Sequence, residues 1–227
     1  MDSITYPRHV LKYNVSTPML FGFDNAILSY ERVYKPGRSW SVNVGFRNLP
    51  RLADPDSSFL INEYKKKGGI SVMADYRFYL MKENRYPAPR GVFLAPFIIG
   101  FSDQFSTGLS VTKDGSPITD EFWINTELIT FGAGLKLGYQ FVFGDHWTVD
   151  LDLLGPSLSY YRLKMEVEDE VEIDEEYREY LEALRDILTD VFPGAQRLFN
   201  EGKLDESGTF STTTSGFQYC IRIGYLF

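Results

Sequence analysis

The residue types that most often act as acids, bases or nucleophiles are scarce in this chain of 227 residues. It has two histidines, His9 and His146, and one cysteine, Cys220. His146 follows Gly144 and Asp145 in a predicted tight turn, and the sequence contains no phosphate-binding loop, zinc-ligand spacing or nucleotide fingerprint. We therefore expect structural roles for these three side chains, no metal, no cofactor and no enzymatic activity.

A second group with chemical potential is a set of charged residues that alternate with apolar ones. In a β-strand this period of two places the charges on one face. If that face lines a narrow barrel, opposite charges have to pair, because a lone buried charge costs on the order of several kcal/mol. The sequence predicts a salt-bridged interior network of nine residues: Lys12, Glu31, Arg47, Asp75, Arg77, Lys136, Asp150, Asp152 and Arg222.

Eight alternating segments are expected to position these charges. The predicted strands are 9–20, 26–34, 40–47, 69–82, 91–103, 126–143, 147–163 and 214–227, after a tail of residues 1–8. After a first tight reversal at 21–25, short turns at 35–38, 84–90 and 144–146 alternate with long loops at 48–68, 104–125 and 164–213. An antiparallel up-and-down order therefore gathers the short turns and both termini at one end of a single domain, residues 9–227.

Two of these strands carry irregularities. The alternation of 147–163 slips at Gly155 and Pro156, which indicates a bulge. Both faces of 91–103 are apolar, so the pattern does not assign them.

Side-chain volume decides which face of the other strands lies inside. An eight-stranded barrel has a lumen only just wide enough for side chains. The apolar faces are bulky, with residues such as Trp40, Phe131 and Phe217, whereas the polar faces are rich in glycine, serine and asparagine. Aromatic residues also gather near strand ends, as in membrane barrels. The prediction is an all-β, eight-stranded antiparallel up-and-down transmembrane β-barrel; a soluble lipocalin-like barrel is the alternative.

The loop at 164–213 is expected to contain a helix at about 174–192. The acidic stretch 166–176 precedes it, Asp174 can cap it, and Pro193 and Gly194 end it. Its apolar face comprises Tyr177, Tyr180, Leu181, Leu184, Ile187, Leu188, Val191 and Phe192. Such a face has to be buried, either on the barrel rim or against a partner protein or lipopolysaccharide.

The chain ends in a strand whose alternating aromatic and aliphatic residues continue to the last position. These are Tyr219, Ile221, Ile223, Tyr225 and Phe227. With the eight strands and the asymmetry of turns and loops, they make residues 9–227 resemble the small eight-stranded outer-membrane barrels of Gram-negative bacteria, the OmpA/OmpX-like group. The resemblance implies an outer-membrane location, periplasmic turns, extracellular loops and a terminal strand read by the outer-membrane assembly machinery. No signal peptide is visible, so we expect a mature form.

The resemblance implies little about activity. We expect a structural or interaction role in the cell envelope, with a closed lumen. The expected partners are outer-membrane lipid, lipopolysaccharide, the assembly machinery and another outer-membrane or surface protein at loop 164–213; the net charge of −8 argues against nucleic acid. Two alternatives are a small-solute channel and a lipid A-modifying enzyme. Some barrels of this size carry that activity on a histidine and a serine at the outer rim, but His9 and His146 both fall at the short-turn end.

Overall fold

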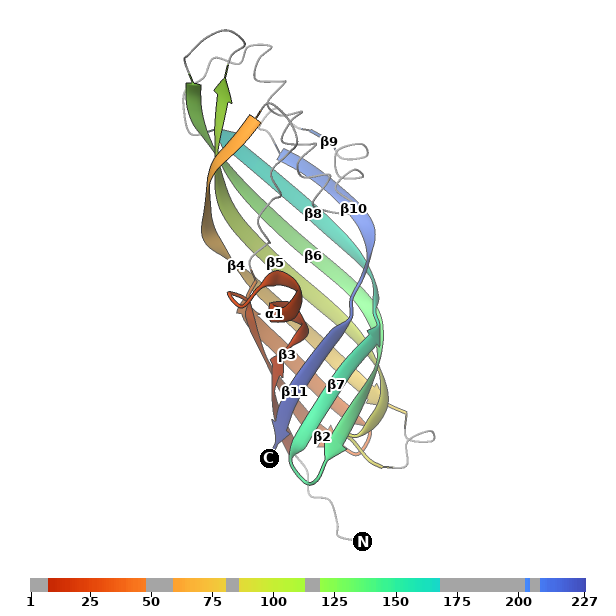
Figure 1. Cartoon of the computed structure of the whole chain (residues 1–227). Helices are drawn as coiled ribbons and strands as arrows, with labels where there is room; N and C mark the ends of the chain where they lie inside the picture. Colours follow the sequence, from red (N-terminus) through yellow and green to blue (C-terminus); the bar gives the residue numbers. More distant parts are fainter. Residues whose placement is uncertain (1–7, 48–58, 81–85, 113–118, 168–202, 205–208) are drawn as a thin grey trace.

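The computed structural model describes residues 8–47, 59–80, 86–112, 119–167, 203–204 and 209–227 (Figure 1). Its elements are β1 (Arg8–Asn14), α1 (Ser16–Phe21), β2 (Ala26–Lys35), β3 (Arg38–Phe46), β4 (Phe59–Tyr79), β5 (Gly91–Thr112), β6 (Thr119–Phe143), β7 (Trp147–Leu154), β8 (Pro156–Val167), β9 (Lys203–Leu204), β10 (Thr209–Phe217) and β11 (Cys220–Leu226). All strand pairs are antiparallel.

The strands form a closed ring in the order β5-β4-β3-β2-β1-β11-β7-β6, which the pairing of β6 with β5 completes. Along the same ring, β8 continues β7 beside β6, and β10 continues β11 beside β8. The ring therefore has eight walls, of which β7 with β8 form one and β11 with β10 another, so the predicted eight-stranded antiparallel barrel is confirmed. The C-terminus and the β2–β3 and β6–β7 turns lie at the lower end in Figure 1.

Two of the eight walls are interrupted at neighbouring points. The break between β7 and β8 falls at Gly155, where the alternation slips in the sequence, and the break between β10 and β11 falls at Gln218. The Gln218 N–H donates to the Gly155 carbonyl oxygen at 2.8 Å, and a Cβ on Gly155 would lie 2.6 Å from the Gln218 carbonyl oxygen. The absence of a side chain at Gly155 therefore allows the two interrupted walls to form a backbone hydrogen bond.

The strands reach further from the short-turn end than the sequence pattern predicts. Residues 59–68, 104–112, 119–125, 164–167 and 209–213 were expected in loops, but the structure places them in β4, β5, β6, β8 and β10. The prediction was wrong there because outward residues such as Lys67, Gln104 and Glu127 are polar, which hides the alternation. These five strands continue as the upper part of the wall in Figure 1.

The first predicted strand, 9–20, is also shorter than expected, because α1 replaces its second half. The Asn14 carboxamide oxygen accepts hydrogen bonds from the Thr17 N–H and the Ser16 hydroxyl, both at 3.0 Å. Such side-chain contacts compete with the strand ladder. Ser16 then holds α1 to β11 by accepting the Ile221 N–H at 3.1 Å. No helix in the described part of the chain is long and apolar enough to span a membrane.

The structure also assigns the two apolar faces of β5. Phe93, Phe97, Phe101 and Phe105 point inward and are at most 7% exposed. The first two rings fit because the neighbouring strand β6 has glycine beside them: Phe93 pairs with Gly138 and Phe97 with Gly134. The rule that bulky residues face outward therefore fails for β5, because the glycines of β6 leave space for large rings inside the barrel.

We predict that Gly138→Ala destabilises the barrel by about 1–3 kcal/mol, because overpacking a filled interior forces strain. The new Cβ would lie 2.3 Å from Phe93 Cζ and 2.7 Å from the Leu151 carbonyl oxygen. Gly100→Ala is the matched control, since its Cβ would meet only the Phe131 ring at 3.5 Å. Urea unfolding in detergent, followed by tryptophan fluorescence, measures both; equal stabilities of the two variants would contradict the packing argument.

Candidate functional site

The lumen of the lower part of the barrel is filled by ionised side chains. Eight of the nine predicted charges lie there, each at most 5% exposed. They are the cations Lys12, Arg77, Lys136 and Arg222 and the carboxylates Glu31, Asp75, Asp150 and Asp152. Four positive charges thus face four negative ones, and the network is neutral as a whole.

The first half of the network centres on Lys12 and Arg77. Lys12 Nζ lies 2.6 Å from both Glu31 Oε2 and Asp150 Oδ2. Arg77 Nη1 lies 2.8 Å from the same Asp150 oxygen, and Arg77 Nε lies 2.9 Å from Asp75 Oδ1. Each of these cations therefore joins two carboxylates from different strands.

The second half extends the chain of ion pairs to the opposite wall. Lys136 Nζ lies 2.8 Å from Asp75 Oδ2 and 3.1 Å from Asp152 Oδ2. Arg222 Nη2 lies 2.8 Å from the same Asp152 oxygen. Because β1, β2, β4, β6, β7 and β11 all contribute a charge, the network crosses the lumen from wall to wall.

The two remaining strands contribute neutral partners. On β3, the Ser39 hydroxyl donates to Glu31 at 2.5 Å and the Ser41 hydroxyl donates to Asp75 at 2.7 Å. On β5, the Phe93 ring lies under the Arg77 guanidinium, 4.4 Å from its Cζ. All eight walls are therefore joined through the lumen.

The prediction of charges missed a neutral hub, Gln140. Its Oε1 accepts from Lys12 Nζ at 3.1 Å, from Arg77 Nη1 at 3.0 Å and from the Tyr79 hydroxyl at 3.0 Å. Tyr79 also donates to Glu31 at 2.9 Å. Both residues lie on the polar faces of their predicted strands, so the alternation itself was the signal that could have found them.

Arg47, the ninth predicted charge, lies apart from this network. Its guanidinium Cζ stacks 4.8 Å from the centre of the Phe101 ring, and its backbone N–H donates to the Gly69 carbonyl oxygen at 3.1 Å. The separation follows from position, because Arg47 comes directly after the last residue of β3, at the end remote from the β2–β3 turn.

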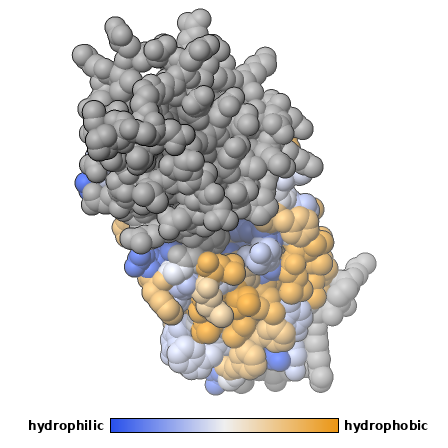
Figure 2. Space-filling view, turned by 45° about the horizontal axis from the view of Figure 1, so that its top comes forward, coloured by the Kyte–Doolittle hydropathy of each residue, from blue (hydrophilic) through white to orange (hydrophobic). Residues whose placement is uncertain are grey.

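The outer surface of the barrel is apolar, whereas its interior is charged and polar. Phe131 is 61% exposed and Phe217 60%, whereas Lys136 is fully buried and Arg222 is 1% exposed. Large exposed apolar side chains occur on the outward face of every wall, and Figure 2 shows orange areas on the side of the barrel below the grey part. Only a lipid environment stabilises this arrangement, and a closed barrel satisfies its backbone there. The chain is a membrane-spanning β-barrel.

The apolar belt of this membrane barrel has a clear border at each end. At the short-turn end the border is aromatic, with paired rings such as Tyr30 with Trp40 and Trp147 with Tyr225, both 5.7 Å between centres. At the other end the outward residues change from apolar to polar along each long strand. The first polar residues there are Lys67, Ser102, Glu127, Arg162 and Ser215.

The predicted terminal signal lies on the lipid-facing side of the last wall. Its residues are 43–64% exposed: Tyr219, Ile221, Ile223, Tyr225 and Phe227. The two histidines hold this strand's end. His9 exchanges backbone hydrogen bonds with Phe227 at 2.9 and 2.8 Å, and the His146 ring stacks on Tyr225 at 5.1 Å. Both contacts are structural.

Cys220, the possible metal ligands and the loop helix complete the predicted site residues. Cys220 is buried on the inward face of β11 and contacts the Ser16 hydroxyl at 3.6 Å. Among the described residues, no group of three or more metal-binding side chains is close enough to hold an ion. The expected helix at 174–192, with its whole apolar face, lies outside the described residues.

Comparisons with known proteins add two structural likenesses. No protein-family model and no curated protein sequence matches the chain. Among solved structures, it is similar to a major outer membrane protein from Thermus thermophilus, with 13% identity, 98% of this chain and 100% of that chain covered, and a TM-score of 0.46. The N-terminal β-barrel domain of Pseudomonas aeruginosa OprF matches with 9% identity, coverage of 97% and 98%, and a TM-score of 0.26. The assignment as a membrane barrel rests on the belt and the buried charges.

We predict that Lys12→Met destabilises the barrel by about 3–5 kcal/mol, because it leaves the lumen with one carboxylate in excess. The double variant Lys12→Met/Glu31→Gln restores neutrality and should lose less stability than the sum of the two single variants. Arg32→Met, an exposed cation on β2, is the control and should change stability by less than about 0.5 kcal/mol. Additive losses in urea unfolding would contradict the coupling.

Proposed function

We propose that the chain is an outer-membrane protein with a structural or interaction role in the cell envelope and no transport pathway. The observation that carries the proposal is the neutral, fully buried ion-pair network across the lumen. A channel needs a hydrated path, and here the cross-section is occupied by the long side chains of Lys12, Arg77, Lys136 and Arg222.

The outer-membrane location is supported by the type of fold. Closed antiparallel barrels with an outward apolar band and aromatic borders are the spanning structures of bacterial outer membranes. The outward alternation of the terminal strand suits the assembly signal that the resemblance implies. In the orientation that the resemblance implies, with short turns in the periplasm, the β2–β3 and β6–β7 turns face the periplasm. The long strands β4, β5 and β6 then project from the outer leaflet.

We predict that the folded protein shows no stepwise conductance in planar lipid bilayers. Arg77→Ser/Arg222→Ser removes the two largest fully buried side chains and should produce a measurable conductance. The variant is compared only after an unboiled sample shows the mobility of the folded barrel on a gel. Conductance of the unaltered protein would reject the closed lumen.

In the proposed interaction role, loop 164–213 docks a partner through the apolar face predicted for residues 174–192. Deleting residues 174–192 should leave the barrel folded, because the described strands complete the ring without them. It should abolish the capture of a partner from outer membranes by the tagged protein, identified by mass spectrometry. Unchanged capture would show that the docking surface lies elsewhere.

A further inference from the structure

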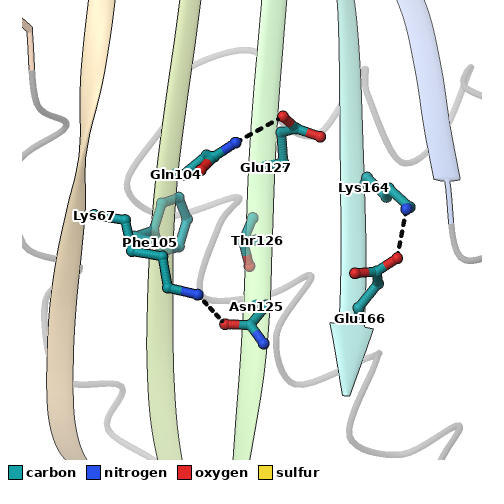
Figure 3. A pocket seen from close by; sticks show the side chains of 8 residues that line it. All are labelled: Lys67, Gln104, Phe105, Asn125, Thr126, Glu127, Lys164 and Glu166. Carbon is teal, nitrogen blue, oxygen red and sulfur yellow. Dashed lines mark hydrogen bonds and ion pairs between the residues drawn. The ribbon is translucent and has the colours of Figure 1, made fainter. Parts of the chain in front are cut away.

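A shallow pocket lies on the outer face of the sheet where the long strands leave the apolar belt (Figure 3). Its volume is about 220 Å³. Residues from β4, β5, β6 and β8 line it: Lys67, Gln104, Phe105, Asn125, Thr126, Glu127, Lys164 and Glu166. Neither the lumen network nor the terminal strand contributes to it, so it is a separate feature of the barrel.

The position of the pocket relative to lipid follows from the outward residues of its strands. Along β5 the outward series runs from Ile98 to Gln104, and along β6 it runs from Phe131 to Glu127. Ile98 is 64% exposed and Phe131 61%. The apolar belt thus gives way to the polar pocket over about 13–20 Å of strand. This is the height at which lipid headgroups meet a membrane barrel.

The pocket lining has four charged residues, and its two cations are placed at the two ends. Lys67 on β4 lies at one end, and Lys164 on β8 at the other, with Arg162 directly below Lys164 on the same outward face. Three strand spacings separate β4 from β8, which is about 14 Å. The ends of the pocket therefore suit two anionic groups separated by a polar spacer.

The carboxylates Glu127 and Glu166 balance the two lysines, so the lining is neutral as a whole, and between its ends the pocket offers hydrogen-bonding groups. Lys67 Nζ donates to Asn125 Oδ1 at 2.8 Å, and Gln104 Nε2 donates to Glu127 Oε1 at 2.9 Å. The Lys67 ammonium thus contacts a neutral oxygen, and no ion pair of Lys67 or Arg162 with another described residue is present. Lys164 pairs with Glu166 on the same strand. Amide and carboxylate oxygens here can accept hydrogen bonds from sugar hydroxyls.

We propose that this pocket binds the diphosphorylated disaccharide headgroup of a lipid A-type glycolipid, with the acyl chains lying on the belt below it. A phosphate at each end of a disaccharide matches the cations at both ends of the pocket, and the sugar hydroxyls match the amides between them. Phosphatidylglycerol presents a single phosphate and reaches only one end. Beneath the pocket, Ile98, Phe131 and Leu158 supply the apolar surface for the chains. This inference rests on the proposed outer-membrane location.

The test uses the full chain, folded in detergent micelles and titrated with purified diphosphoryl lipid A, with native mass spectrometry counting bound lipid. We expect Lys67→Gln and Lys164→Gln each to weaken binding about tenfold, since each removes one charge-assisted phosphate contact. Arg32→Gln/Lys35→Gln is the matched control. These exposed cations lie at the short-turn end, and their loss should leave lipid A binding unchanged.

A second titration decides whether both ends of the pocket are used. Diphosphoryl lipid A should bind at least about tenfold more tightly than phosphatidylglycerol, and monophosphoryl lipid A should bind with intermediate affinity. Equal binding of phosphatidylglycerol and lipid A, or unaltered binding by the Lys67 and Lys164 variants, would overturn the proposal. A negative result in these titrations would reject the lipid A site but not the closed lumen. The bilayer recording tests the closed lumen separately on the same folded sample.

Discussion

The mutual neutralisation of charges inside a narrow, closed lumen is the interaction on which the structure depends. Four cations and four carboxylates share a space without solvent exposure, and every one of them has an oppositely charged partner within 3.1 Å. Since a single unpaired member would carry a large desolvation cost, the pairs act as a set. They also define the register of the walls, because a slip by one residue would turn each charge toward lipid.

The steric arrangement around this network is equally tight. Glycines on β6 leave room for the phenylalanine rings of β5, and Gly155 allows the backbone of Gln218 to approach. Where polar side chains become local partners of the backbone, as Asn14 and Ser16 do, the strand stops and α1 begins. Both the fit of side chains and the pairing of charges therefore contribute to closing the barrel.

Because the lumen is filled, the surfaces that other molecules can reach lie on the outside of the protein. The lipid-facing belt, the terminal strand held between His9 and His146, and the polar band above the belt are the surfaces that meet other molecules. The pocket between Lys67 and Lys164 lies in that band, and the proposed docking loop follows β8. Both proposed contacts therefore lie at the end of the barrel remote from the short turns, where the long strands β4, β5 and β6 project.

The alternation of Trp40, Val42, Val44 and Phe46 and its counterparts in seven other segments was enough to determine an eight-stranded barrel, its antiparallel order and the inward direction of Lys12, Glu31 and Arg222. A period of two is a local property of the strand, so a single sequence carries it. The tertiary structure alone decided the faces of β5, the ends of β1 and β4, and which cation meets which carboxylate. Those outcomes depend on contacts between residues far apart in the chain, such as Lys12 with Asp150 and Phe93 with Gly138, which no local pattern records.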